Sequence, residues 1–76
     1  MKIELHLYAT LRQYEPEGHQ GVLEIEDGTT VEDLLVTMGV PLEQAKLVYV
    51  NGRRVNLDYT FKDGDRVGIF PPVAGG

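Results

Sequence analysis

The chain has 76 residues, is 42% hydrophobic and carries a formal net charge of −5, which fits one small globular domain and excludes a disordered chain. It has no cysteine, so disulfides and thiolate metal sites are excluded, and its acidity argues against nucleic acid or an anionic membrane as a partner. No apolar run reaches transmembrane length and no signal-peptide pattern opens the chain, so we expect a soluble cytoplasmic protein.

The first part of the chain predicts two paired strands. Residues 2–8 alternate apolar and polar side chains, which is typical of a half-buried strand. Residues 14–21 collect charged residues, proline and glycine and predict an exposed loop. A second strand is predicted over 22–26, and we expect the two strands to form a hairpin across this loop.

A short helix is predicted to begin at Thr29 or Thr30. Either threonine can cap the helix, because Glu32 or Asp33 follows three positions later in the pattern of a capping box. Apolar residues then recur at helical spacing, and Gly39 suits the left-handed position that ends a helix. A helix this short must be stabilised by packing on a sheet.

The second half predicts three further strands. After a brief polar turn over 43–46, the apolar residues 47–50 predict a third strand. Asn51-Gly52 is a strong signal for a two-residue hairpin turn, and Val55 is expected on the returning strand. A turn around Gly64 then leads into a last strand over 66–70.

This order of elements predicts an α+β fold, with a mixed sheet of four to five strands and one main helix across one face. We expect the folded domain to span 1–70 and residues 71–76 to form a flexible C-terminal tail. The predicted core consists of the apolar residues on one side of the sheet and on the inner face of the helix: Ile3, Leu5, Leu7, Leu23, Ile25, Val31, Leu34, Leu35, Met38, Val48, Val50, Leu57, Val67 and Ile69.

The body of the domain offers little catalytic chemistry. The chain has no serine, so a Ser-His-Asp site is excluded, and His6 and His19 stand apart from any metal-ligand pattern. Asp27, Asp63 and Asp65 lie beside glycines, as turn residues do, without the spacing of a calcium loop. We therefore expect no enzymatic activity of the chain's own, and no bound metal or cofactor.

Three aromatic residues are predicted to lie on the face of the sheet opposite the core. Strand alternation places Tyr8, Tyr49 and Phe70 there. They are either singly exposed aromatics, which are common on protein surfaces, or the anchors of a docking patch. Their nearness to the C-terminal residues favours docking.

The last seven residues, Phe-Pro-Pro-Val-Ala-Gly-Gly, predict an extended tail. Pro71 and Pro72 cannot donate to a ladder, so strand pairing should stop there. The side chains then shrink to glycine, which suits a narrow channel, and the end carries a carboxylate with a pKa of about 3.5. Activated as a mixed anhydride with a nucleotide, this carboxylate becomes an acyl donor. The alternative is an inert, frayed terminus.

Several stretches of this sequence resemble the MoaD/ThiS family of sulfur carriers. These are LYATLR at 7–12, GTTVEDLL at 28–35, VNGR at 50–53, DGDRV at 63–67 and FPPVAGG at 70–76. The resemblance spans nearly the whole chain, and its last heptad is most similar to MoaD, the small subunit of molybdopterin synthase. It implies a ubiquitin-like β-grasp fold with the first strand beside the last and the last beside the third, so that the three aromatics become neighbours.

The resemblance also implies a reaction and partners. An E1-like adenylating enzyme of the MoeB/ThiF type would use ATP and Mg²⁺ to activate the Gly76 carboxylate, and sulfur would replace the adenylate to give a thiocarboxylate. In the MoaD branch, the loaded tail enters the large subunit of molybdopterin synthase (MoaE type) and donates sulfur to the pterin precursor. Gly75 and Gly76 would form the reactive end. The partner-contacting residues would be Tyr8, Tyr49, Phe70, Pro71, Pro72, Val73 and Ala74.

Three alternatives to molybdopterin synthesis stay open at this point. The chain could carry sulfur for thiamin or another metabolite, as ThiS does. It could be a ubiquitin-like modifier that is joined to lysines through Gly76. It could also be a binding module whose tail does no chemistry.

Overall fold

The computed structural model describes residues 1–15, 21–45 and 47–72. Its elements follow one another as β1 (Lys2–Leu7), the 3₁₀ helix η1 (Ala9–Tyr14), β2 (Val22–Glu24), α1 (Val31–Met38), the 3₁₀ helix η2 (Leu42–Gln44), β3 (Leu47–Val50), β4 (Arg53–Val55) and β5 (Arg66–Phe70).

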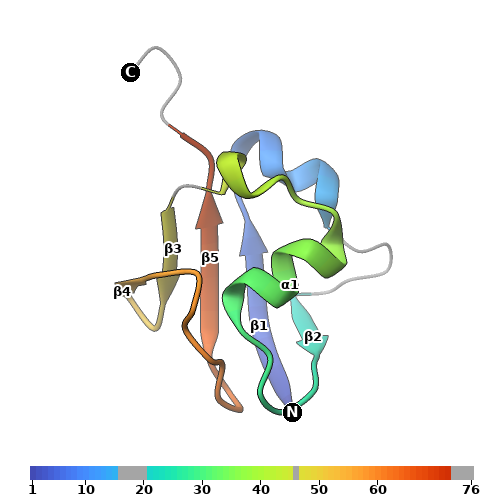
Figure 1. Cartoon of the computed structure of the whole chain (residues 1–76), viewed down its shortest axis with the longest axis vertical. Helices are drawn as coiled ribbons and strands as arrows, with labels where there is room; N and C mark the ends of the chain where they lie inside the picture. The colour runs from blue at the N-terminus through green and yellow to red at the C-terminus, as the bar shows by residue number, and fades with distance from the viewer. Residues whose placement is uncertain (16–20, 46, 73–76) are drawn as a thin grey trace.

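The strands form one mixed sheet in the order β2-β1-β5-β3-β4. The central strand β5 runs parallel to β1 and antiparallel to β3, and the outer pairs β1–β2 and β3–β4 are antiparallel. Helix α1 lies across one face of this sheet (Figure 1). The predicted α+β arrangement is therefore confirmed, including the hairpin of the first two strands and the placing of the last strand between the first and the third.

Local sequence signals explain the turn after β3 and the two ends of α1. Asn51 and Gly52 both have positive φ, 54° and 82°, which is the conformation of a tight two-residue hairpin turn. Thr30 caps α1: its hydroxyl accepts from the Asp33 N–H, and the Asp33 carboxylate accepts from the Thr30 N–H. Gly39 has φ of 78° and ends the helix, as predicted.

The ends of some elements differ from the prediction. The first strand ends at Leu7 and the second at Glu24, one and two residues earlier than predicted. Tyr14 belongs to η1, so the predicted loop begins later, and residues 16–20 of that loop lie outside the described residues. The polar turn before β3 contains the helical turn η2. Apolar periodicity does not reveal such short 3₁₀ segments.

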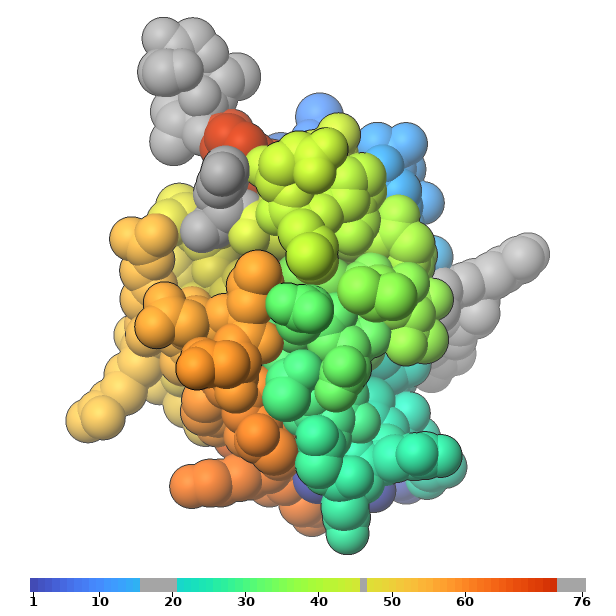
Figure 2. Space-filling model, viewed as in Figure 1, coloured from blue at the N-terminus to red at the C-terminus, as the bar shows by residue number. Residues whose placement is uncertain are grey.

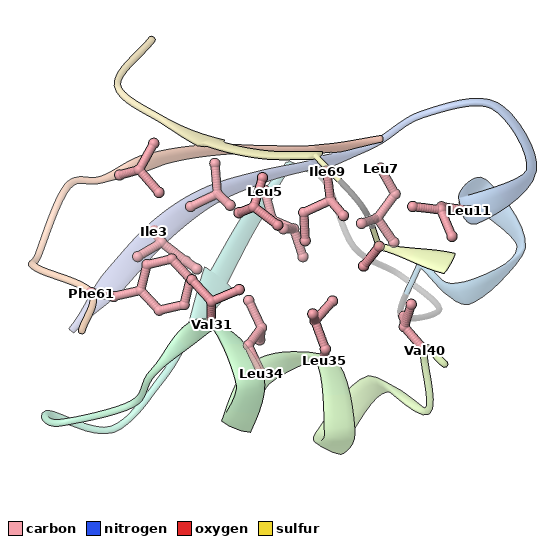
Figure 3. Packing of buried hydrophobic residues seen from close by; sticks show 14 residues of the cluster. Ile3, Leu5, Leu7, Leu11, Val31, Leu34, Leu35, Val40, Phe61 and Ile69 are labelled. Carbon is pink, nitrogen blue, oxygen red and sulfur yellow. The ribbon is translucent and has the colours of Figure 1, made fainter. Parts of the chain in front are cut away.

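The core lies between the sheet and α1 (Figure 3). Most predicted core residues are buried, but Leu23, Ile25, Met38 and Leu57 are only half-buried, since they lie on or after the edge strand β2, at the end of α1 and in the segment before β5. The prediction missed four buried residues outside its regular elements: Leu11, Val40, Ala45 and Phe61.

The segment 57–62 completes the second layer beside α1. Its backbone carbonyls at Tyr59 and Leu57 accept from the N–H groups of Val31 and Glu32, at 2.9 and 3.0 Å. These bonds satisfy donors that the first turn of a helix leaves unpaired. In Figure 2 this segment (orange) lies directly against the start of α1 (green).

Asp65 is a buried carboxylate, 5% exposed, at the start of β5. It accepts hydrogen bonds from the Tyr59 hydroxyl at 2.8 Å, the Lys62 N–H at 2.8 Å and the Asn51 side-chain amide at 2.9 Å. Burial alone would raise the pKa of Asp65, but these hydrogen bonds outweigh burial and leave the pKa below its ordinary value. The predicted turn residue therefore also joins the β3–β4 turn and the 57–62 segment to β5.

Candidate functional site

The face of the sheet opposite α1 carries the three aromatic residues singled out in the sequence. Each follows or precedes a buried neighbour, Leu7, Val48 or Ile69, and so points to the other side. Tyr8 comes just after β1, but its backbone is still extended and its N–H donates to the Ile69 carbonyl at 3.1 Å. We call this surface, made by Tyr8, Tyr49 and Phe70, the aromatic face.

The three rings are in contact because of the strand register. Gly68 of the central strand β5 pairs with His6 on one side and with Tyr49 on the other. The rings of Tyr8 and Phe70 stack with centroids 4.3 Å apart and planes within 2° of parallel. Tyr49 meets Phe70 edge to face at 5.9 Å and 88°. Both arrangements are favourable for aromatic pairs, and they make the aromatic face one continuous surface.

Gly68 forms the floor of a shallow depression beside these rings. A β-carbon at this position would lie 3.4 Å from a ring carbon of Tyr8 and 3.5 Å from one of Phe70. A methyl group would therefore already reach contact distance with both rings, and any larger side chain would push them apart. The absence of a side chain at Gly68 leaves room for the two stacked rings beside it.

Ala9 turns the chain away from the sheet directly after Tyr8. Its φ is +53°, a left-handed conformation that is uncommon for a residue with a β-carbon. The next residues form η1, whose Leu11 is buried in the core. The burial of Leu11 therefore fixes the path of the chain directly after Tyr8.

A charged cluster borders the depression on the side away from the tail. Glu4 accepts from His6 Nε2 at 2.9 Å, and Arg66 Nε lies 3.5 Å from the same carboxylate oxygen. The hydrogen bond to His6, aided by the positive charge of Arg66, holds the pKa of Glu4 below its ordinary value. All three side chains are solvent-accessible, so they give the margin of the aromatic face a polar character.

The C-terminal segment starts at the aromatic face. Pro71 is half-buried and Pro72 is exposed, and they follow Phe70 without any spacer. Neither proline has an N–H to donate, so the ladder ends at Phe70 as predicted. Val73, Ala74, Gly75 and Gly76 lie outside the described residues, and the roles assigned to them stay predictions.

The structure brings Tyr8, Tyr49, Phe70 and Pro71 together at one end of β5, as the resemblance implied. Sequence reasoning singled out the aromatics but missed Gly68 and the cluster of Glu4, His6 and Arg66. The signal was present, since alternation along β1 and β5 places all four of these residues on the same face as Tyr8 and Phe70.

Within residues 1–15, 21–45 and 47–72, no group of three or more acidic or histidine side chains is placed to hold a metal ion. No helix in this part of the chain is long and apolar enough to cross a membrane.

Comparison with known proteins adds three findings. The profile of the ThiS family matches residues 5–76. Small archaeal modifier protein 3 of Haloferax volcanii is 35% identical over a 94-residue alignment that covers all of both chains. Two solved structures share the fold. One is a candidate molybdopterin converting factor, subunit 1, from Pyrococcus furiosus (TM-score 0.65, 28% identity, 95% of this chain and 98% of that one). The other is SAMP1 of H. volcanii (TM-score 0.67, 23% identity, all of both chains), which supports the ubiquitin-like β-grasp fold alone.

Proposed function

Because this chain belongs to the ThiS family of small sulfur carriers and ubiquitin-like proteins, we propose that it carries an activated acyl group on the carboxylate of Gly76. An adenylating enzyme of the MoeB/ThiF type, with ATP and Mg²⁺, performs the activation, and this chain is the substrate rather than the catalyst. We also propose that the chain works in the cytoplasm, because the activating enzyme requires ATP.

One observation carries this proposal: the aromatic face and the C-terminal segment meet at Phe70. Phe70 is the last residue of the central strand and directly precedes Pro71. Its ring lies between those of Tyr8 and Tyr49 in the aromatic face. A partner that covers these rings therefore holds the start of the tail in a fixed place. Six residues from Pro71 onward span roughly 20 Å when extended, which is sufficient to reach an active site away from the docking surface.

The chemistry requires two steps, an adenylyl transfer followed by an acyl transfer. A carboxylate oxygen of Gly76 attacks the α-phosphorus of ATP, and pyrophosphate leaves. A hydrosulfide ion supplied by a partner then attacks the acyl carbon, and AMP leaves with the electron pair of the broken bond. The product is the Gly76 thiocarboxylate, which donates its sulfur to an acceptor.

For the acceptor we propose the pterin precursor of molybdenum or tungsten cofactor, bound by a molybdopterin synthase large subunit of the MoaE type. The P. furiosus structure favours this acceptor, since it is described as subunit 1 of a molybdopterin converting factor and shares 28% identity with this chain. Sulfur transfer to thiamin or another metabolite would use the same thiocarboxylate with a different partner.

The H. volcanii relative favours a second function, modification of proteins. Its name is that of a modifier protein, and its 35% identity extends over the whole chain. In this reaction the amine of a target lysine attacks the activated acyl carbon of Gly76 and forms an isopeptide bond. Activation is common to both functions, and only the second nucleophile differs.

Intact-mass spectrometry of the chain from its native cell separates these functions. Sulfur carriage predicts a species heavier by the mass difference between sulfur and oxygen, located to Gly76 by fragmentation. Modification predicts Gly76 joined to lysines of other proteins. Finding only the unmodified carboxylate, even after incubation with the cognate activating enzyme, ATP and a sulfur source, would contradict both.

A further inference from the structure

A second surface lies at the opposite edge of the sheet from the β3–β4 hairpin, on the side that carries α1. Here a groove of about 1120 Å³ lies between α1 and β2. Figure 1 shows β2 at the edge of the sheet, beside α1. Half-buried or buried apolar side chains line it on both sides, among them Leu23, Ile25 and Met38. Val36 on α1 also lines the groove and is 64% exposed. None of these residues belongs to the aromatic face.

The backbone of β2 offers hydrogen-bonding groups along this groove. Ile25 exchanges both of its backbone bonds with Met1, at 2.8 and 2.9 Å, and the Gly21 carbonyl accepts from Leu5 at 2.8 Å. Hydrogen-bonded residues alternate in an antiparallel pair, so Val22 and Glu24 direct their N–H and C=O groups away from β1. Within the described part of the chain the sheet ends at β2, so these groups form an open strand edge.

The charges around the groove have one sign. Glu26 lines it just beyond β2, and Glu32 and Asp33 line it from the first turn of α1. Glu24 borders it at the strand edge, with its side chain on the opposite face of the sheet. No lysine, arginine or histidine is present among the described residues that line the groove. An apolar floor with only carboxylates around it selects for a ligand that is both apolar and basic, and it disfavours an acidic one.

We propose that this groove binds an extended segment of a partner protein in which apolar residues alternate with lysine or arginine. The segment pairs with the outward N–H and C=O groups of Val22 and Glu24 and adds a strand to the sheet. Its apolar side chains pack on Leu23, Ile25 and the exposed side of α1. Its alternating basic side chains point to the other face of the sheet, beside Glu24, and basic residues at its ends lie near the carboxylates of α1. Because the groove and the aromatic face are separate, one partner or two can occupy both surfaces together.

A synthetic peptide, acetyl-KKVKVKVKK-amide, tests this proposal by ¹⁵N NMR titration of the full chain. We expect shift changes over residues 22–26 and 32–38, and slower hydrogen exchange at the amides of Val22 and Glu24. The same peptide with glutamate in place of lysine should bind at least about tenfold more weakly, because the carboxylates would repel it. A peptide that is N-methylated at the pairing amides should lose binding, because it cannot donate to β2.

Two matched charge reversals locate the site. Glu32→Lys changes a carboxylate of the groove, and Glu43→Lys makes the same change of charge at an exposed position in η2, outside the groove. Glu32→Lys should weaken peptide binding about two- to fivefold, and Glu43→Lys should not. The proposal would be overturned if the two variants had equal effects, or if the N-methylated peptide bound as well as the unmodified one. It would also be overturned if shift changes were confined to Tyr8, Tyr49 and Phe70, or if no shift change appeared at about 1 mM peptide.

Discussion

Phe70 contributes both to the sheet and to the proposed docking surface. Its backbone ends the central strand, while its ring lies on the open face between Tyr8 and Tyr49. The ring is half-buried and contacts both aromatic neighbours. A partner that covers the remaining surface of this ring gains an aromatic anchor whose position is already fixed.

Replacing Phe70 by alanine should therefore affect binding more than folding. We expect the variant to bind its activating enzyme about 1–3 kcal/mol more weakly, as is typical of an aromatic anchor. The loss of unfolding free energy should stay below the roughly 3–5 kcal/mol of a core phenylalanine. The half-buried ring loses its stacked pair with Tyr8, worth about 0.5–1.5 kcal/mol, and only part of the burial of a core side chain. Isothermal calorimetry and thermal denaturation measure the two effects.

Val22→Ala is the matched control, since Val22 is an exposed apolar residue on the same face of the sheet but on the edge strand β2. This variant should bind the activating enzyme as the unmodified chain does. If Phe70→Ala bound normally and melted far earlier, Phe70 would be a core residue and the aromatic face would not be the docking surface.

At the scale of elements, β5 organises the molecule. It pairs on both sides and is the last strand in the described part of the chain, and the buried carboxylate of Asp65 fixes the chain just before it. Asp65 receives its hydrogen bonds from two separate segments: from Asn51 in the β3–β4 turn, and from Tyr59 and Lys62 in the 57–62 segment. The strand that carries the tail is thus fixed at the end opposite Phe70.

Asp65→Asn should destabilise the domain at neutral pH. The amide keeps one acceptor oxygen but places an NH₂ group against a donor, which costs about 1–3 kcal/mol of unfolding free energy. The effect should also depend on pH. Because the pKa of Asp65 is lowered by folding, its contribution is fully present above the ordinary value of 3.8 and is lost as pH falls through the lower, folded-state pKa.

Urea denaturation between neutral pH and about pH 2.5 measures this dependence. The unmodified chain should lose stability more steeply than Asp65→Asn as pH falls below 3.8. Asp58→Asn removes an exposed carboxylate and is the control. If Asp65→Asn behaved like Asp58→Asn at every pH, the buried hydrogen bonds of Asp65 would not contribute to stability.

At the scale of the whole molecule, the sequence predicted the features that follow from periodicity and from turn residues. Alternation located the strands and the aromatic face, and Asn51-Gly52 and Gly39 located the turn and the end of the helix. The sequence did not reveal what depends on tertiary packing. Phe61 and Leu11 are buried although they lie outside the strands and the α-helix. In the sequence Asp65 has the pattern of an ordinary turn aspartate, and only the folded structure shows that it is buried and bonded to the Tyr59 hydroxyl.

Pairing across the sheet was accessible only through the family resemblance. The alternation of residues 2–8 and 66–70 does not indicate that these two segments are neighbours, and paired residues such as Glu4 and Arg66 are 62 positions apart in the chain. The contact of Tyr8 with Phe70 follows from that pairing. The groove between β2 and α1 also needed the structure, since it depends on which strand lies at the edge.

The most direct test of the account is ATP–pyrophosphate exchange by the cognate activating enzyme, with the Gly76 end moved by one residue in either direction. Deleting Gly76, or adding one alanine after it, displaces the carboxylate by about 3.5 Å. Misplacement of a reacting group by ~1 Å can cost on the order of a hundredfold in rate. We predict that both variants melt at the temperature of the unmodified chain, still bind the enzyme through the aromatic face, and support no exchange. Normal exchange with either variant would show that the Gly76 carboxylate is not the reactive group, and a binding module with an inert tail would then be the correct description.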